Sequence, residues 1–377
     1  MKQDSDLCNN LKSIRTRLGM SQQELAKLAG VSRQTITGVE SGQYAPSVAM
    51  TLRLAKALGC QVEDLFWLEQ ELPQIKAVLA KPVPRDQQMR FSLAQVGGQW
   101  IAYPLIGKDA FRIEMVPADA EGTSVTGTDE VLLRLLDDNL GKLQNTVVIA
   151  GCAPVLSLWA RATERWHPQL RVQFNHANSM SALHSLCRGE AHIAGMHLYD
   201  PETGEHNASF ASEALAGRAA VLITLGVWEE GLLVQPENPM GIRTVADLAT
   251  KGAIIVNREH GAGSRLLLER KLQEEQVSFD AVKGFDRIVK SHQDVAQAVA
   301  TGIADAGIST ASVAATFGLG FIPLHKSRYD LVILKEYLEE APVQQLLSTL
   351  SHPLVHSQLK IIGGYDTSKT GEVVATI

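Results

Sequence analysis

Residues 21–42 read SQQELAKLAGVSRQTITGVESG, and this stretch decides the fold of the N-terminal part of the chain. Ser21 is a preferred residue at the start of a helix, and Glu24 three residues later completes a capping box. Gly30 ends this first helix, and Ser32 caps a second one. Two short helices joined by a tight turn that contains glycine predict a helix-turn-helix.

The helical pattern continues on both sides of this motif and predicts five short helices between residues 7 and 66. In a helix-turn-helix, the start of the second helix meets base edges in the major groove and the preceding helix meets phosphate. Arg33 can donate a forked pair of hydrogen bonds to guanine, and Gln34 can pair with adenine. The candidate DNA-binding residues are Gln22, Ser32, Arg33, Gln34, Thr37 and Gln43.

Residues 11–66 resemble the Cro/C1-type (XRE) helix-turn-helix family. The resemblance runs through MSQQELAKLAGVSRQTITGVESGQYAPSVAMTLRLAKALG and therefore covers the whole five-helix unit. It implies an all-α DNA-binding domain over residues 1–68. The alternative is a helical bundle whose polar surface has no role or binds another protein.

Length and charge agree with more than one domain. The chain has 377 residues and a formal net charge of −6, and this length predicts two or three domains. Residues 1–65 hold eight Lys+Arg against six Asp+Glu, and the remainder holds 27 against 35. A weakly basic N-terminal segment followed by an acidic remainder is consistent with a nucleic-acid-binding module joined to a domain that does not bind nucleic acid.

The sequence also allows a prediction of where in the cell the protein acts. The first residues, MKQDSDLCNN, are polar, so we expect no signal peptide. No apolar run approaches the roughly 20 residues of a membrane helix. The four cysteines are scattered without metal-binding spacing, so we expect a reduced, cytoplasmic setting.

Residues 69–144 connect the two main parts. Prolines and charges near their start predict a linker, and apolar alternation around Gly97-Gly98 predicts a β-hairpin. The segment DEVLLRLLDDNLGKL (residues 129–143) predicts a short amphipathic helix.

Strands and helices alternate over residues 145–377, which predicts an α/β domain with mostly parallel sheets. Residues 219–242 predict two strands bridged by a turn. Residues 318–324 and 329–334 predict two further strands, and the tail from 336 predicts helices.

Residues 256–265, VNREHGAGSR, lie where an apolar strand gives way to a helix. Helix N-termini favour anions, and the glycines, among them Gly263, let the backbone approach a ligand closely. Arg258 and Arg265 can donate charge-assisted hydrogen bonds, and Ser264 can donate a hydroxyl bond. We interpret the stretch as an anion cradle, and the alternative is a glycine-rich turn with surface arginines. If one arginine faces outward, we expect Arg265 to do so and to pair with Glu269.

Other strand-to-helix junctions carry small donors, and ligands of open α/β sheets sit beyond the carboxyl ends of strands. The candidates at these ends are Cys152, Asn178, Ser179, His197 and His292. No partner base for Cys152 can be named, and the histidines form no metal motif, so we expect no catalytic or metal-binding residue. For His197 the alternative is a hydrogen-bonded core histidine. No nucleotide fingerprint appears, because HGAGSR lacks the P-loop lysine.

Residues 146–335 resemble the periplasmic-binding-protein-like domain that is fused to such DNA-binding modules and is related to molybdate- and tungstate-binding proteins. The motifs are CRGEAHIAGMHLYDPETGEHN, NREHGAGSRLLLERKL, SHQDVAQAVATGIADAGIS and LGFIPLHKSRYDLVIL. The resemblance implies a type II, two-lobe domain, with a small parallel sheet in each lobe and the ligand between them. The family often has Asp or His near the position of Ala153. Because this chain has alanine there, we expect no contact between the ligand and a polar side chain at position 153.

The whole sequence predicts a multidomain cytoplasmic transcription regulator, not an enzyme. It is expected to bind operator DNA as a homodimer, without membrane contact and without a cofactor. Its effector is expected to be a small anion: molybdate, tungstate or a molybdenum-cofactor-related compound. The alternatives are the same architecture with a different organic ligand, or an enzyme acting on a molybdopterin-type substrate. A pair of titratable groups facing each other in the cleft would favour the enzyme.

Overall fold

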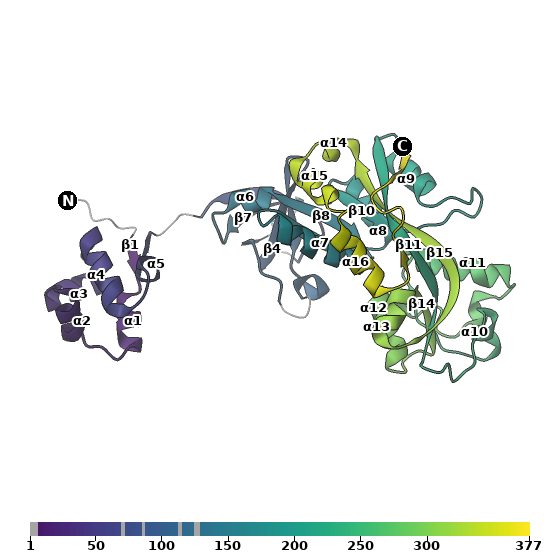
Figure 1. The fold of residues 1–377 in the computed structure, drawn as a ribbon, viewed down its shortest axis with the longest axis horizontal. Coiled ribbons are helices and arrows are strands. Elements are labelled where there is room, and N and C mark those ends of the chain that lie inside the picture. The colour runs from purple at the N-terminus through teal and green to yellow at the C-terminus, as the bar shows by residue number, and fades with distance from the viewer. Residues whose placement is uncertain (1–6, 69–71, 85–86, 112–114, 124–128) are drawn as a thin grey trace. The chain divides into compact units, whose positions relative to one another are not determined.

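The computed structural model describes residues 7–68, 72–84, 87–111, 115–123 and 129–377. Its contacts divide the chain into two units, Met1–Pro73 and Gln74–Ile377, and many of their elements are labelled in Figure 1. The polar start of the chain and parts of the linker predicted over residues 67–90 fall outside the described ranges. Within the described part, the linker prediction is wrong for Gln74–Leu79, which form a strand. No helix in these ranges is long and apolar enough to cross a bilayer.

The first unit contains the five predicted helices. They are α1 (Leu11–Arg17), α2 (Gln22–Ala29), α3 (Arg33–Glu40), α4 (Val48–Leu58) and α5 (Val62–Leu65). The predicted capping box is confirmed, because Ser21 Oγ accepts from the Glu24 amide at 3.2 Å and Glu24 Oε2 accepts from the Ser21 amide at 2.7 Å. A short antiparallel ribbon of β1 (Leu7–Asn9) and β2 (Phe66–Leu68), which the sequence did not predict, joins the two ends of the bundle.

The second unit begins with a closed barrel in the order β3-β5-β4-β6-β7. Its strands are β3 (Gln74–Leu79), β4 (Gln88–Val96), β5 (Gln99–Pro104), β6 (Ala120–Thr123) and β7 (Glu130–Leu135). The hairpin predicted at Gly97-Gly98 is confirmed, since Val96 pairs with Gln99 and both glycines have positive φ. The barrel packs on the following domain, where Ser92 Oγ lies 2.8 Å from Gln173 Oε1.

The helix predicted over residues 129–143 is wrong in its first half. Val131, Leu133 and Leu135 are buried, whereas Leu132 between them is 53% exposed. This is the two-residue period of a strand with one buried face, and it forms β7. Only α6 (Leu140–Gln144) is helical.

The rest of the second unit forms two lobes, each with its own core. The first lobe contains β8 (Thr146–Gly151), α7 (Val155–Trp166), β9 (Arg171–His176), α8 (Ser179–Cys187), β10 (Ile193–Met196) and α9 (Ala208–Leu215). The second contains α10 (Ala246–Thr250), β12 (Asn257–Arg258), α11 (Gly263–Glu274), η2 (Phe279–Ala281), β13 (Ile288–Val289), α12 (His292–Ala300), β14 (Ala306–Thr310) and α13 (Ala311–Phe317).

Two long antiparallel strands connect the lobes (Figure 1). They are β11 (Ala220–Val234) and β15 (Gly320–Leu334), and the main sheet runs in the order β14-β11-β15-β10-β8-β9. The expectation of a small parallel sheet in each lobe is confirmed in part. Strand β8 pairs in parallel with β9 and β10, and β12 with β13, whereas the pairs that involve β11 or β15 are antiparallel.

The turn predicted within residues 219–242 is also wrong, because β11 continues through Glu229 and Glu230. The two strands predicted after residue 317 likewise form one strand, β15. The helical tail is confirmed in part. Helices α14 (Lys335–Leu338), α15 (Ala341–Ser348) and α16 (Pro353–Ile362) are followed by β16 (Tyr365–Asp366) and β17 (Val373–Thr376), which pair with β11.

Candidate functional sites

The start of α3 forms an exposed polar face on the first unit. Gly30 ends α2 in the left-handed conformation with φ of 68°, and Ser32 caps α3 by accepting from the Thr35 amide at 3.0 Å. These local contacts fix the turn between the helices. The candidates Ser32, Arg33, Gln34, Thr37 and Gln43 are all exposed.

Gln22 differs from these candidates because its side chain is held inside the unit. Its amide nitrogen donates to Glu40 at 2.7 Å, and its amide oxygen accepts from Thr37 at 3.3 Å. Arg15 also binds Glu40, at 2.6 and 3.2 Å. Burial would raise the pKa of Glu40, but the bonds from Arg15 and Gln22 lower it below its ordinary value. This network fixes α1, α2 and α3 to one another.

In the second unit, the stretch VNREHGAGSR joins β12 to α11, and its two arginines have different environments. Arg265 donates to Glu269 at 2.7 Å, as its spacing predicted, and its guanidinium lies 5.1 Å from the centre of the Phe285 ring. The expectation that Arg265 would be the outward-facing arginine is wrong, because it is only 5% exposed. Arg258 is 1% exposed. It donates to Glu259 and to the Lys290 carbonyl, but its Nη1 has no hydrogen-bond partner in the described residues.

Ser264 binds a carboxylate of the protein itself. Its hydroxyl donates to Glu230 Oε1 at 2.7 Å, and Ser327 donates to the other oxygen at 2.5 Å. Glu230 is 1% exposed and also lies 3.2 Å from His197 Nδ1. Glu230 was not among the residues predicted from the sequence. The available signal was an acidic residue, in VWEEGLLV, within an otherwise apolar strand.

Gly263 brings the second lobe against the first. A Cβ at this position would lie 2.3 Å from the His197 carbonyl oxygen and 2.6 Å from His197 Nδ1. Such approaches are shorter than van der Waals contact, so only glycine fits here. Asn178 closes the same junction, because its amide nitrogen donates to Glu259 Oε1 at 3.1 Å and to the His260 carbonyl at 3.3 Å. The two lobes are therefore in direct contact.

Cys152, His197 and His292 meet at this contact, although each follows a different strand in the sequence. One potential ligand atom from each side chain lies within 4.8 Å of the others, and all three residues are buried. Ser179 supports the group by accepting from the His197 amide at 3.2 Å. These residues were predicted as separate ligand-binding candidates and not as metal ligands, so their convergence was not predicted.

Aromatic residues and charges surround the three side chains. The Trp228 ring lies 4.8 Å from that of His197 and 5.5 Å from that of His292. Burial would lower the pKa of His197, but Glu230 and Cys152 raise it to about 10. The pKa of Glu230 is lowered below its ordinary range by His197 despite burial. Burial, Arg258 and His197 lower the pKa of His292 well below its ordinary value.

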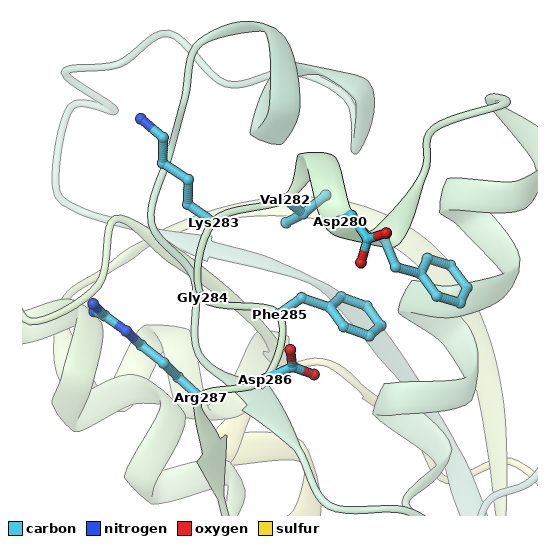
Figure 2. Close-up of a pocket in the computed structure, with 8 residues that line it drawn as sticks. Asp280, Val282, Lys283, Gly284, Phe285, Asp286 and Arg287 are labelled. Carbon is cyan, nitrogen blue, oxygen red and sulfur yellow. The ribbon is translucent and has the colours of Figure 1, made fainter.

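A separate hollow of about 580 Å³ lies along residues 279–287. Figure 2 shows Phe285 and Asp280 on one side of this loop, with Lys283 and Arg287 extending to the opposite side. None of the predicted site residues lines the hollow. The candidate ligand residues are instead gathered in the closed contact between the lobes.

Comparisons with known proteins match two families to two different parts of the chain. Residues 160–351 match the family described as PBP superfamily domain, and residues 11–65 match the family described as helix-turn-helix. The Bacillus subtilis (strain 168) protein named "Uncharacterized protein YvgK" is 35% identical over 199 residues, and this match spans 53% of this chain and 64% of that protein.

Two further likenesses involve different parts of the chain. The Bacillus subtilis "Uncharacterized HTH-type transcriptional regulator YgzD" is 44% identical over 63 residues, which are 17% of this chain and 96% of that protein. A solved phosphate-bound structure from Clostridium perfringens, described as a putative phosphate ABC transporter substrate-binding protein, is 14% identical with a TM-score of 0.46. It covers 58% of this chain and 98% of its own. The chain belongs to the PBP superfamily domain family and carries a helix-turn-helix domain at its N-terminus.

Proposed function

We propose that this protein is a ligand-responsive transcription regulator. The observation that carries the proposal is the exposed polar face of α3, where Ser32, Arg33, Gln34 and Thr37 are available to base edges. It is supported by the relative YgzD, which is named an HTH-type transcriptional regulator. We propose that the protein acts in the cytoplasm as a homodimer.

The second unit would be the sensor, and its effector would be a small anion. Arg258 Nη1 and Trp228 Nε1 support this assignment, because both are buried donors without a partner in the described part of the chain. Leaving a buried donor unsatisfied costs about 1–3 kcal/mol, and more for a charged group. The Trp228 ring lies 5.5 Å from that of His292, and the charge of Arg258 lowers the pKa of His292. An anion that accepted from either donor would remove its penalty.

The resemblance to molybdate- and tungstate-binding domains makes these two oxyanions the first candidates, with molybdenum-cofactor-related compounds next. Thermal unfolding with molybdate, tungstate, sulfate, phosphate and a molybdopterin precursor tests the choice. A ligand present at 100 times its Kd adds about 2.7 kcal/mol of stability. If none of these compounds shifts the unfolding temperature, the anion assignment is wrong.

Arg258→Ala tests the site itself. Removing a buried charge-assisted contact costs about 1.5–3 kcal/mol, or roughly ten- to a hundredfold in affinity. Calorimetry with the best anion should show this loss in Arg258→Ala and unchanged affinity in Arg287→Ala, an exposed arginine of the same lobe. Equal affinity in both folded variants would exclude Arg258 from the site.

Effector binding would change DNA affinity by changing how far the two lobes are closed on each other. Gly263, Arg258 and His292 belong to the second lobe, while Cys152 and His197 belong to the first. A ligand that contacts both groups stabilises the closed arrangement more than an open one. In a dimer, such a change would alter the geometry of the two DNA-binding units. Effector-dependent operator affinity in a fluorescence anisotropy titration checks this coupling.

An enzyme remains the second candidate, because His197 and Glu230 face each other at 3.2 Å beside Cys152. A nucleophile, a base and a carboxylate that orients the base are the parts of a catalytic triad. However, the amides of Cys152 and Ala153, which could bind an oxyanion, already donate to Tyr329 Oη at 3.3 and 3.4 Å. Conversion of a molybdopterin precursor by the wild type, lost in Cys152→Ala, would establish the enzyme.

A further inference from the structure

We propose that Cys152, His197 and His292 together bind one thiophilic transition-metal ion, Zn²⁺ or Cu⁺. Their ligand atoms all lie within 4.8 Å of one another. Zinc lies about 2.3 Å from sulfur and about 2.0–2.1 Å from nitrogen, which separates its ligand atoms by about 3.4–3.6 Å. The three side chains therefore need to approach one another by only about 1 Å to coordinate an ion.

The hydrogen bonds of His292 leave one ring nitrogen free. His292 Nδ1 lies 3.1 Å from Ser309 Oγ, and the Ser309 hydroxyl lies 3.4 Å from the His292 carbonyl oxygen. If the hydroxyl donates to that carbonyl, its oxygen accepts from Nδ1–H, and Nε2 carries a lone pair. This Nε2 is buried and has no partner among the described residues. A buried acceptor without a donor is what a metal ion would satisfy.

His197 is oriented in the same way by a carboxylate. Glu230 Oε2 lies 3.2 Å from Nδ1, so the proton of this ring belongs on Nδ1 when the metal is bound. Ligand histidines in metal sites usually donate their second ring N–H to a carboxylate or carbonyl oxygen, which fixes the tautomer and strengthens the ligand. Glu230 is itself held by Ser264 and Ser327. Both histidines thus have the outer contacts of metal ligands.

The kind of ligand atom decides which cation fits the cluster. Cys152 offers sulfur, and His197 and His292 offer ring nitrogens. Thiolate and imidazole ligands select zinc or Cu⁺ rather than magnesium or calcium, which prefer oxygen.

The site would join the two lobes, since Cys152 and His197 come from the first and His292 from the second. Three protein ligands leave a fourth zinc position open. This inference goes beyond the proposed function and does not require that the effector be an anion or that the protein bind DNA.

Metal content of the full-length protein tests the proposal. Purified protein, stripped with a chelator, is dialysed against Zn²⁺ or, without oxygen, against Cu⁺, and bound metal is measured by mass spectrometry. We expect one ion per chain in the wild type and at least tenfold weaker binding in Cys152→Ser and His292→Gln. Cys187→Ser and His184→Gln, on α8 of the first lobe and outside the cluster, are the matched controls and should bind as the wild type does.

Co²⁺ provides a second measurement on the wild type, so the test does not depend on the variants folding. Cobalt bound through Cys152 gives a thiolate charge-transfer absorption in the near ultraviolet, which excess Zn²⁺ should remove. Folded wild type that binds neither Zn²⁺ nor Cu⁺, or cluster variants that bind as tightly as the controls, would overturn the proposal. Operator binding measured on the same samples separates this result from the regulator assignment, because DNA binding without metal uptake rejects only the metal site.

Discussion

Glu230 Oε2 lies 3.2 Å from His197 Nδ1, and each residue is buried in the contact between the lobes. The sequence places the carboxylate in the middle of strand β11 and the imidazole after strand β10. Their pairing allows β11 to continue through an acidic segment that the sequence predicted to be a turn. It also provides the charge partner that a buried carboxylate requires.

Glu230→Gln should therefore destabilise the second unit strongly. Removing one partner of a buried ion pair costs about 3–5 kcal/mol, because the other charge is left unpaired. Glu229→Gln is the matched control, since Glu229 is adjacent on β11 and only half-buried. Urea unfolding should show a lower midpoint for Glu230→Gln alone. Equal midpoints for the two variants would contradict the importance of the pair.

The same substitution should weaken metal binding if the proposed site exists. Altering an outer-shell partner of a metal ligand typically costs ten- to a hundredfold in metal affinity. Competition with a chromogenic zinc chelator should show this loss in Glu230→Gln and no loss in Glu229→Gln. Full affinity in a folded Glu230→Gln protein would show that the carboxylate does not support the metal site.

Gly263→Ala should push the lobes apart, because the added Cβ would lie 2.3 Å from the His197 carbonyl oxygen. Overpacking of this kind typically costs about 1–3 kcal/mol. Gly141→Ala is the control, since the nearest atom to its Cβ would be 3.7 Å away. Thermal unfolding should show a lower midpoint for Gly263→Ala only. A midpoint equal to that of the wild type would mean that the lobe contact is easily rearranged.

The DNA-binding face should separate into base-reading and supporting residues. Arg33→Ala and Gln34→Ala should relax base preference, because their side chains are exposed at the start of α3. Gln22→Ala should weaken binding to all sequences, because Gln22 holds Glu40 and Thr37. Operator selection followed by anisotropy titrations checks both effects. Unchanged base preference in both α3 variants would reject the recognition role of this helix.

Glu40 should make the first unit sensitive to acid. Its pKa is lowered in the folded state, so its stabilising contribution is complete above about pH 4.5, its ordinary value. The contribution is lost as the pH falls through the lower, folded-state pKa. Glu40→Gln should cost about 1.5–3 kcal/mol at pH 7 and less at lower pH. Thermal unfolding of the wild type, Glu40→Gln and the exposed control Glu63→Gln is measured from pH 7 to pH 3. If the stability difference between the wild type and Glu40→Gln were the same at every pH, the prediction would be wrong.

The sequence by itself determined the elements whose contacts are local. The capping box at Ser21, the left-handed Gly30, the hairpin at Gly97-Gly98 and the Arg265–Glu269 pair all join residues no more than four positions apart, so a short stretch contains the whole interaction. The alternation of strands and helices likewise indicated the α/β domain. Local sequence predicted the wrong structure in two places. Residues 129–135 form a strand because their apolar side chains pack in the barrel core. Glu230 lies within a strand because it pairs with His197, which is distant in the sequence, and not with solvent.

Only the tertiary structure brought Cys152, His197 and His292 together and placed Ser264 on Glu230 instead of on a ligand. The sequence identified most of these residues because small polar side chains at strand ends are visible locally. The sequence did not indicate which of these residues contact one another. The distances between their side chains are set by the packing of the two lobes on the long strands β11 and β15. The partners of a buried polar group are decided by that packing, because removal from water makes each group dependent on whichever side chain reaches it.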